Sequence, residues 1–247
     1  MFKNLDKLKK IINNAPNYPG VYIFFNSKNE PIYIGKAVKL KTRLKYYIDK
    51  NVLQKYPKTL KMVQNSYDIK YFIVDTEVEA LVLEANLIKK YSPKYNINLK
   101  DGKFYKYIEV IKDKTGTYKV RSVRKKTPQG TYFGPYPSGT DVFYVLKSLR
   151  KVFPYRDCSL VKFNYYKKLE RPCLYGNIGL CFAPCLSNNN RANTQSINML
   201  KKFLNGKAKK VITSLRKQMI KLSKEQKFEE AQVVKKRLLN YEYLSKK

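Results

Sequence analysis

The sequence contains no histidine at all. This absence excludes Ser-His-Asp and Cys-His nucleophilic schemes, histidine-ligated zinc catalysis and imidazole general bases. An enzyme with this composition must work with tyrosine, lysine, arginine and carboxylates.

Long apolar runs are also missing, so no segment is suited to span a bilayer. The first twenty residues lack the apolar core of a signal peptide and include Asp6. Four cysteines without an export signal indicate a reducing cytoplasm, where clustered thiols more often bind metal than form disulfides. We therefore expect a cytoplasmic protein with no membrane segment.

Acidic residues are scarce: 18 Asp and Glu stand against 52 Lys and Arg, which gives a net charge of +34. The excess is spread along the whole chain rather than collected in a tail. A positive electrostatic field over the whole protein favours a polyanionic partner. Nucleic acid is a better candidate than an anionic membrane surface. The lysine bias of an AT-rich genome accounts for part of the charge but not for so few acids.

Hydrophobic periodicity and turn residues predict most elements. The expected helices cover residues 5–14, 36–48, 76–91, about 141–153 and most of 199–247, where KEQKF forms a turn. The expected strands cover 20–25, 31–35 and 69–74, with two more within 103–125. Residues 131–141 and 187–196 are expected to be a loop and a linker.

Glu84 occupies the apolar stripe of the 76–91 helix. A carboxylate there loses hydration, which costs several kcal/mol unless a cation compensates. Two interpretations remain, a metal ligand or a salt bridge to a nearby basic residue. On the 36–48 helix, the spacing of Lys36, Arg43 and Tyr47 places all three on one flank. That flank either grips phosphate or is simply solvated.

Three blocks then stand in a specific order: GVY and PIYIGKAVKLKTRLKYYI, TEVEALVLEANLIKKYSPKYNINLKD, and TYFGPYPS. The first resembles the signature of GIY-YIG nucleases, and all three in register resemble the UvrC excision-repair family. The resemblance implies an α+β fold, a small mixed or antiparallel sheet flanked by helices, followed by a cysteine segment and a C-terminal helical hairpin.

The same resemblance implies roles for individual residues. Glu84 matches the ligand of a catalytic Mg²⁺ or Mn²⁺, and Arg43 matches the arginine that steadies the phosphate. Tyr22 or Tyr33 matches the phenol that orients or deprotonates water, with support from Lys36, Tyr47 and Asn96. The two phenols converge only if the hairpin loop is even or carries a bulge, because strand side chains alternate.

The four cysteines lie within 28 residues: Cys158, Cys173, Cys181 and Cys185. Their spacing suits either structural Zn²⁺ or an iron–sulfur cluster, and four unrelated thiols are the remaining alternative. The similarity of RPCLYGNIGLCFAPC to the cysteine region of the UvrC family implies a 4Fe-4S cluster.

The last fifty residues carry two apolar stripes that predict a helical hairpin too small to fold alone. Its pattern resembles the UVR motif, which implies docking on a UvrB-like protein; the alternative is packing on its own domain. The expected contact residues are Leu215, Met219, Leu222, Phe228 and Ala231.

These features divide the chain into a nuclease domain (1–100), a connecting region (101–157), the cysteine cluster (158–186), a linker (187–198) and the UVR-like hairpin (199–247). The resemblance implies a metal-dependent endonuclease that nicks double-stranded damaged DNA 3′ to a lesion, where a UvrB-like partner positions it. A stand-alone GIY-YIG nuclease or a non-catalytic DNA-binding adaptor are the alternatives. The family continues beyond this half, and the sequence leaves open whether residue 247 is the natural end.

Overall fold

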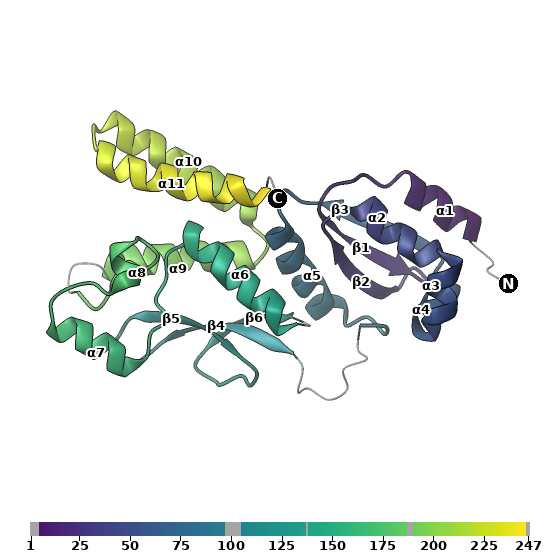
Figure 1. The fold of residues 1–247 in the computed structure, drawn as a ribbon, viewed down its shortest axis with the longest axis horizontal. Coiled ribbons are helices and arrows are strands. Elements are labelled where there is room, and N and C mark those ends of the chain that lie inside the picture. The colour runs from purple at the N-terminus through teal and green to yellow at the C-terminus, as the bar shows by residue number, and fades with distance from the viewer. Residues whose placement is uncertain (1–4, 97–104, 137, 187–189, 246–247) are drawn as a thin grey trace. The chain divides into compact units, whose positions relative to one another are not determined.

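The computed structural model describes residues 5–96, 105–136, 138–186 and 190–245. Contacts divide the chain into two compact units, with the boundary between residues 103 and 104. The end of the NINLKD block, Pro137 of TYFGPYPS, the first three residues of the expected linker and residues 246–247 lie outside the described part. Both units mix helices with small antiparallel sheets, so the expected α+β class is confirmed (Figure 1).

The first unit contains a three-stranded sheet in the order β2-β1-β3, formed by β1 (Gly20–Phe25), β2 (Pro31–Ala37) and β3 (Asp68–Ile73). Its helices are α1 (Leu5–Asn13), α2 (Leu40–Lys45), the 3-10 turn η1 (Tyr46–Ile48), α3 (Lys50–Lys55), α4 (Pro57–Gln64) and α5 (Glu77–Tyr91).

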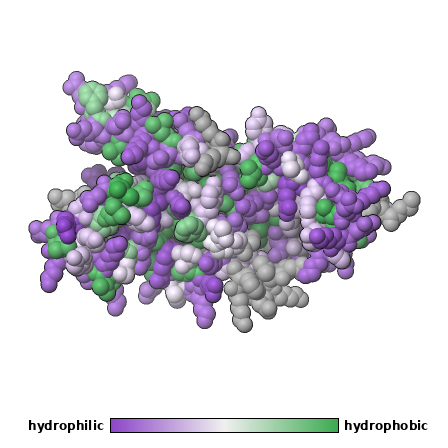
Figure 2. Space-filling model, in the orientation of Figure 1, coloured by the Kyte–Doolittle hydropathy of each residue, from purple (hydrophilic) through white to green (hydrophobic). Residues whose placement is uncertain are grey.

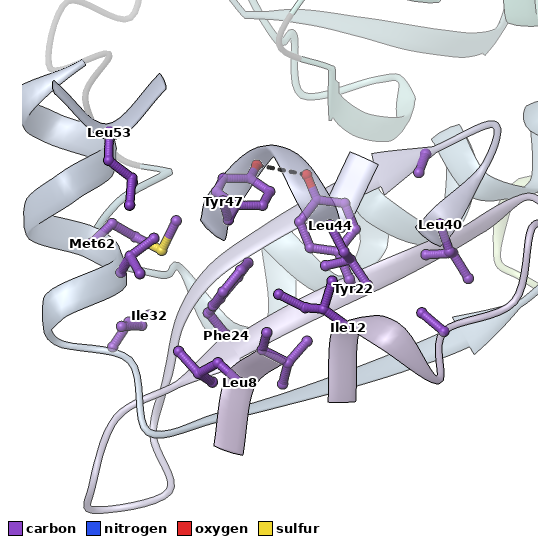
Figure 3. Packing of buried hydrophobic residues seen from close by; sticks show 14 residues of the cluster. Leu8, Ile12, Tyr22, Phe24, Ile32, Leu40, Leu44, Tyr47, Leu53 and Met62 are labelled. Atoms are coloured by element: carbon purple, nitrogen blue, oxygen red, sulfur yellow. Dashed lines mark hydrogen bonds between the residues drawn. The ribbon is translucent and has the colours of Figure 1, made fainter. Parts of the chain in front are cut away.

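Alternation along β1 gives this sheet two buried faces. Val21 and Ile23 pack with residues of α5 on one face. Tyr22 and Phe24 pack on the other, with side chains from α1, α2 and α4 (Figure 3). The sheet is therefore sandwiched, and the phenol of Tyr22 is fixed inside a core.

Helix α5 begins and ends where its sequence signals predict. The Thr76 hydroxyl accepts a hydrogen bond from the Glu79 backbone N–H at 3.0 Å, which caps the first turn. Ser92, in the left-handed conformation with φ 44°, ends the helix just before Pro93. These local signals hold Glu84 in the middle of the helix.

The second unit contains a sheet in the order β5-β4-β6, formed by β4 (Lys106–Lys112), β5 (Tyr118–Val123) and β6 (Thr131–Tyr136). Its helices are α6 (Gly139–Val152), α7 (Leu160–Lys168), α8 (Leu174–Asn177), α9 (Asn190–Leu204), α10 (Ala208–Lys224) and α11 (Phe228–Ser245). Helix α6 packs on β4 and β6, α9 on β5, and α11 on α6.

Three sequence expectations are wrong. Lys36 lies on β2, because its pairing with Val21 extends the strand, and α2 begins only at Leu40. Residues 131–136 form edge strand β6 rather than a loop; an edge position tolerates Pro135, which lacks an N–H. Helix α9 occupies most of the expected linker, and the Asn193 side chain there is buried and donates to the Tyr118 carbonyl.

The expected connecting region, cysteine segment and terminal helices together form one compact unit. The rings of Phe153, Phe203 and Tyr241 pack in sequence, with centroids 5.5 and 6.4 Å apart, and so join α6, α9 and α11 through one core. Helices α3, α4, α7 and α8 were not predicted. In the described part of the chain, no helix is long and apolar enough to cross a bilayer.

Candidate active site

Three tyrosine hydroxyls and one guanidinium form a continuous hydrogen-bonded chain in the first unit. Arg43 Nε donates to Tyr22 Oη at 3.3 Å, Tyr22 and Tyr47 share a bond of 2.7 Å (Figure 3), and Tyr47 donates to Tyr33 Oη at 3.4 Å. Because Tyr47 donates to Tyr33, Tyr22 is the donor to Tyr47. The chain of donors therefore runs from Arg43 to Tyr33. The hydroxyl proton of Tyr33 takes part in none of these three bonds.

A bulge brings the two strand phenols together. The β1–β2 register shifts between Phe24 and Phe25, so that Phe24 faces Tyr33 while Tyr22 faces Gly35. Tyr22 and Tyr33 consequently project from the same face, with ring centroids 6.2 Å apart. The convergence that the sequence left open is achieved by the bulge.

The three phenols differ in exposure. Tyr22 and Tyr47 are buried, and Tyr33 is only partly buried. Burial, with the neighbouring phenols adding to it, raises the pKa of Tyr22 and of Tyr47 well above the ordinary value. Both therefore stay protonated at neutral pH, and Tyr33 is the phenol that solvent reaches.

Arg43 lies at the exposed end of this chain. Its guanidinium packs over the ring of Tyr46, 5.0 Å from the centroid, as well as near Tyr47. Burial lowers the pKa of Arg43, but Tyr47 and Tyr22 raise it, and the net direction is upward. Tyr46 was not among the predicted site residues, although its i, i+3 spacing from Arg43 is a usable signal.

Glu84 is 8% exposed, and its Oε1 accepts a hydrogen bond from the Lys36 backbone N–H at 3.0 Å. The end of β2 is thereby tied to α5. The Lys36 ammonium lies 3.5 Å from Glu77 Oε1, and this ion pair was not predicted from the sequence. The Lys36 backbone thus contacts the buried Glu84 carboxylate, although Lys36 does not share a helix flank with Arg43.

The Asn96 side chain binds the backbone of Ile34 at the outer edge of β2. Its Oδ1 accepts from the Ile34 N–H and its Nδ2 donates to the Ile34 carbonyl, both at 2.7 Å. The side chain therefore completes the backbone pairing of an edge strand. Its role in the structure is to fix the strand that carries Tyr33 and Lys36.

A basic pocket of about 540 Å³ adjoins these groups. It is lined by Lys36, Ala37, Val38, Lys39, Thr42, Arg43 and Tyr46, with no acidic residue among them. Lys36 links the two parts of the site, since its backbone contacts Glu84 and its residue lines the pocket with Arg43. Cations in this arrangement suit a phosphodiester.

A metal site made by several carboxylates or thiols is not present among the residues that the structure describes, where no group of three or more Asp, Glu, Cys or His is arranged to hold an ion. This does not argue against a hard cation at Glu84, because Mg²⁺ keeps most of its waters and needs only one or two protein carboxylates.

All four cysteines are free and partly buried. Burial raises the pKa of Cys181 to about 12, and the nearby Cys173, Cys158 and Cys185 add to the rise. Burial also raises the pKa of Cys185. Cys173, Cys158 and Cys185 thus lie near enough to Cys181 to raise its pKa, although no three of the four described thiols are arranged to hold an ion.

Helices α10 and α11, the terminal hairpin, pack on their own unit. Leu215 is fully buried, Ala231 is 8% exposed, and Arg237 and Asn240 donate to carbonyls at the end of α6. Of the five expected contact residues, only Phe228 presents a largely exposed side chain, at 64%. Met219 and Leu222 are partly buried.

Comparisons with known proteins match the chain along its length. Residues 18–97 match the model of the UvrC-like GIY-YIG domain, 105–201 that of the UvrC/Cho excinuclease middle domain, and 209–244 that of the UvrB/uvrC motif.

Curated relatives carry the name UvrABC system protein C. Those from Thermotoga petrophila and Mycoplasma mycoides are 39% and 38% identical over 95% and 97% of this chain. The chain spans 40% and 39% of their lengths. A solved GIY-YIG endonuclease domain of UvrC from Thermotoga maritima, bound to magnesium, is 45% identical; the match covers 37% of this chain and 97% of that one, with a TM-score of 0.34.

Proposed function

We propose that this chain, which belongs to the UvrC family, is a metal-dependent endonuclease that nicks damaged DNA on the 3′ side of a lesion. The observation that carries the proposal is the pairing of two features in one unit. A chain of phenols ends at Arg43, and the strand beside it is bonded to the buried carboxylate of Glu84. This combination provides phosphodiester hydrolysis without histidine.

Glu84 is the residue that would hold Mg²⁺ or Mn²⁺. Its carboxylate is a hard oxygen donor, and burial makes a compensating cation favourable. When bound, such an ion supplies charge neutralisation at the phosphate and acidifies a coordinated water. Magnesium is the first ion to test.

The remaining roles fall to side chains of this chain. Arg43 grips the phosphate through its fork of N–H donors, with Lys36 and Lys39 adding charge along the same pocket. Tyr33 orients the attacking water, because it is the partly exposed end of the phenol chain. Tyr22 and Tyr47 hold Tyr33 and Arg43 in place, and Asn96 fixes β2.

The decisive experiment replaces Glu84 by glutamine, which keeps the shape and removes the charge. We expect Mg²⁺-dependent nicking of plasmid or lesion-containing duplex to fall by at least about 100-fold, because charge stabilisation at the phosphate is lost. DNA binding, measured by fluorescence anisotropy, should persist. The matched control is Glu30→Gln, in the exposed turn between β1 and β2, where the carboxylate accepts a hydrogen bond from Asn26.

Nicking by Glu84→Gln at the rate of Glu30→Gln would remove Glu84 from the metal site. Loss of DNA binding together with nicking would point instead to a folding defect, which circular dichroism and urea unfolding of both variants would reveal. A wild-type chain that binds DNA but does not nick with Mg²⁺ or Mn²⁺, alone or with a UvrB-like partner, would favour the adaptor alternative.

For the cysteines we propose a shared metal site, a 4Fe-4S cluster before Zn²⁺. Support comes from their clustering within 28 residues of the sequence and from the partial burial of all four thiols in one unit. Because no three of them are arranged around an ion in the described structure, ligation would have to draw the thiols together. Iron, sulfide and zinc analysis after anaerobic purification tests this. Stoichiometric zinc without iron would replace the cluster by zinc, and the absence of both would refute metal binding.

The partner that we propose is a UvrB-like protein bound through the terminal hairpin. The buried stripe of the hairpin is already used within its own unit, so docking must use its exposed apolar residues. These are Ile220, Phe228, Val233, Leu239 and Tyr243. Phe228, at the turn between the two helices, is the most exposed of them and is our candidate anchor.

A further inference from the structure

The second unit contains a pocket of about 620 Å³ between the cysteine segment, the end of α6 and helix α11. This volume lies within the range of small-molecule sites. Its walls combine apolar side chains, among them Ile178, Leu180 and Phe182, with the cationic residues Lys151, Lys236 and Arg237. No acidic residue is among its lining residues.

Arg237 is the unusual group in this pocket. The residue is 7% exposed, and no carboxylate of the described residues is found to act on its charge. Its Nε donates to the Val152 carbonyl at the end of α6, which explains why one nitrogen is buried there. Its Nη2 is buried without a hydrogen-bond partner.

A buried guanidinium nitrogen that lacks a partner costs free energy unless an acceptor is supplied from outside the chain. Burial lowers the pKa of Arg237 to about 10, and no carboxylate is found to offset this effect. The other charged residues that line the pocket are also positive. Lys151 and Lys236 are exposed at the same pocket and can reach an anion there. Asn177 and Asn240 add amide groups.

We propose that this pocket binds a phosphate group, contributed by a nucleic-acid strand or a free mononucleotide, with Arg237, Lys151 and Lys236 as its cationic contacts. The apolar wall at Phe182, whose ring lies 5.9 Å from the Arg237 guanidinium, favours a phosphate that carries a base over inorganic phosphate. The site is separate from Glu84 and Arg43, which belong to the other unit, and it does not depend on nuclease activity.

The test is an NMR titration of the full, isotopically labelled chain with thymidine 5′-monophosphate, with thymidine as the ligand that lacks phosphate. We expect saturable shifts in the amides of residues 176–182 and in the Arg237 Nε–H signal with the monophosphate only. The variant Lys151→Gln/Lys236→Gln should weaken this binding by about tenfold, the loss typical of charge-assisted hydrogen bonds. Because both lysines are exposed, the fold should be unaffected.

The matched control is Lys147→Gln/Lys235→Gln, which removes the same charge from exposed positions of the same two helices outside the pocket. Equal weakening in the control would overturn the site in favour of a general positive field. Absence of saturable shifts, or identical shifts with thymidine, would overturn the phosphate. Displacement of the monophosphate by a short single strand identifies the strand as the source, whereas retention identifies a free mononucleotide.

Discussion

Gly35 lies directly beneath the phenol of Tyr22, which couples the two halves of the GVY and YIG motifs. A Cβ added at Gly35 would stand 2.4 Å from Tyr22 Oη and 2.6 Å from Cζ. Real Cβ contacts are not this short, so the ring must move. We therefore predict that Gly35→Ala displaces Tyr22 from Tyr47 and Arg43.

The expected cost follows from three contributions. Overpacking a closed core costs about 1–3 kcal/mol, and loss of the buried Tyr22–Tyr47 hydrogen bond adds about 1 kcal/mol. The stiffer backbone of alanine returns about 0.4–1 kcal/mol through the unfolded state. Gly35→Ala should thus lower the free energy of unfolding by about 1–3.5 kcal/mol.

The functional loss should exceed the loss of stability. A displacement of about 1 Å at a reacting centre can cost about 100-fold in rate. Urea unfolding gives the stability, and Mg²⁺-dependent nicking per folded molecule gives the activity. Gly130→Ala is the matched control, because its Cβ would meet another phenol, Tyr132 Oη, at 2.5 Å, in the second unit.

Two outcomes would refute this reasoning. A Gly35→Ala protein with wild-type stability and nicking would show that Tyr22 yields without cost and does not position Arg43. A fall in nicking equal to that of Gly130→Ala would show that the effect is one of general stability. A selective loss in Gly35→Ala supports the phenol chain as the positioning device.

Two further predictions follow from exposure differences within the site and the terminal hairpin. Tyr33→Phe should slow turnover with little change in stability. Tyr22→Phe should instead lower the free energy of unfolding by about 1 kcal/mol, because a buried hydroxyl loses its partners. Steady-state nicking and urea unfolding separate the two effects, and a reversed pattern would contradict the assigned roles. Phe228→Ser should weaken binding to a UvrB-like partner, measured by calorimetry, without loss of stability. Leu215→Ser should instead destabilise the fold by about 2–4 kcal/mol, because its side chain is fully buried. Unchanged partner binding by Phe228→Ser would reject the proposed anchor.

Elements with complete local signals could be predicted from the sequence. The hairpin of β1 and β2 follows from alternation around a turn, and α5 from a capping threonine and a stop at Ser92-Pro93. The buried position of Glu84 follows from the same helical spacing. Each depends on residues only a few positions apart, which is why the pattern alone suffices.

Errors arose where a distant partner outweighs the local pattern. Lys36 follows a strand and precedes helix-forming residues, and pairing with Val21 keeps it on β2. The polar run at Asn193 has the composition of a linker, but packing against β5 buries it within α9. For the terminal hairpin the sequence left packing on its own domain as an alternative to docking, and the structure shows that α6 and α9 contact the hairpin within its own unit.

The sequence by itself determined which residue types are available for chemistry: the chain is basic and free of histidine, and its tyrosines, Arg43 and Glu84 stand in an order that resembles the GIY-YIG nucleases. Only the tertiary structure decided that a bulge turns Tyr22 and Tyr33 to one face, and that Tyr33 is the phenol left accessible. It also decided that Arg237 is buried beside a basic pocket. The sequence specifies the residue types directly. The strand register, the burial of each side chain and the convergence of the phenols depend on contacts between segments that are far apart in the sequence.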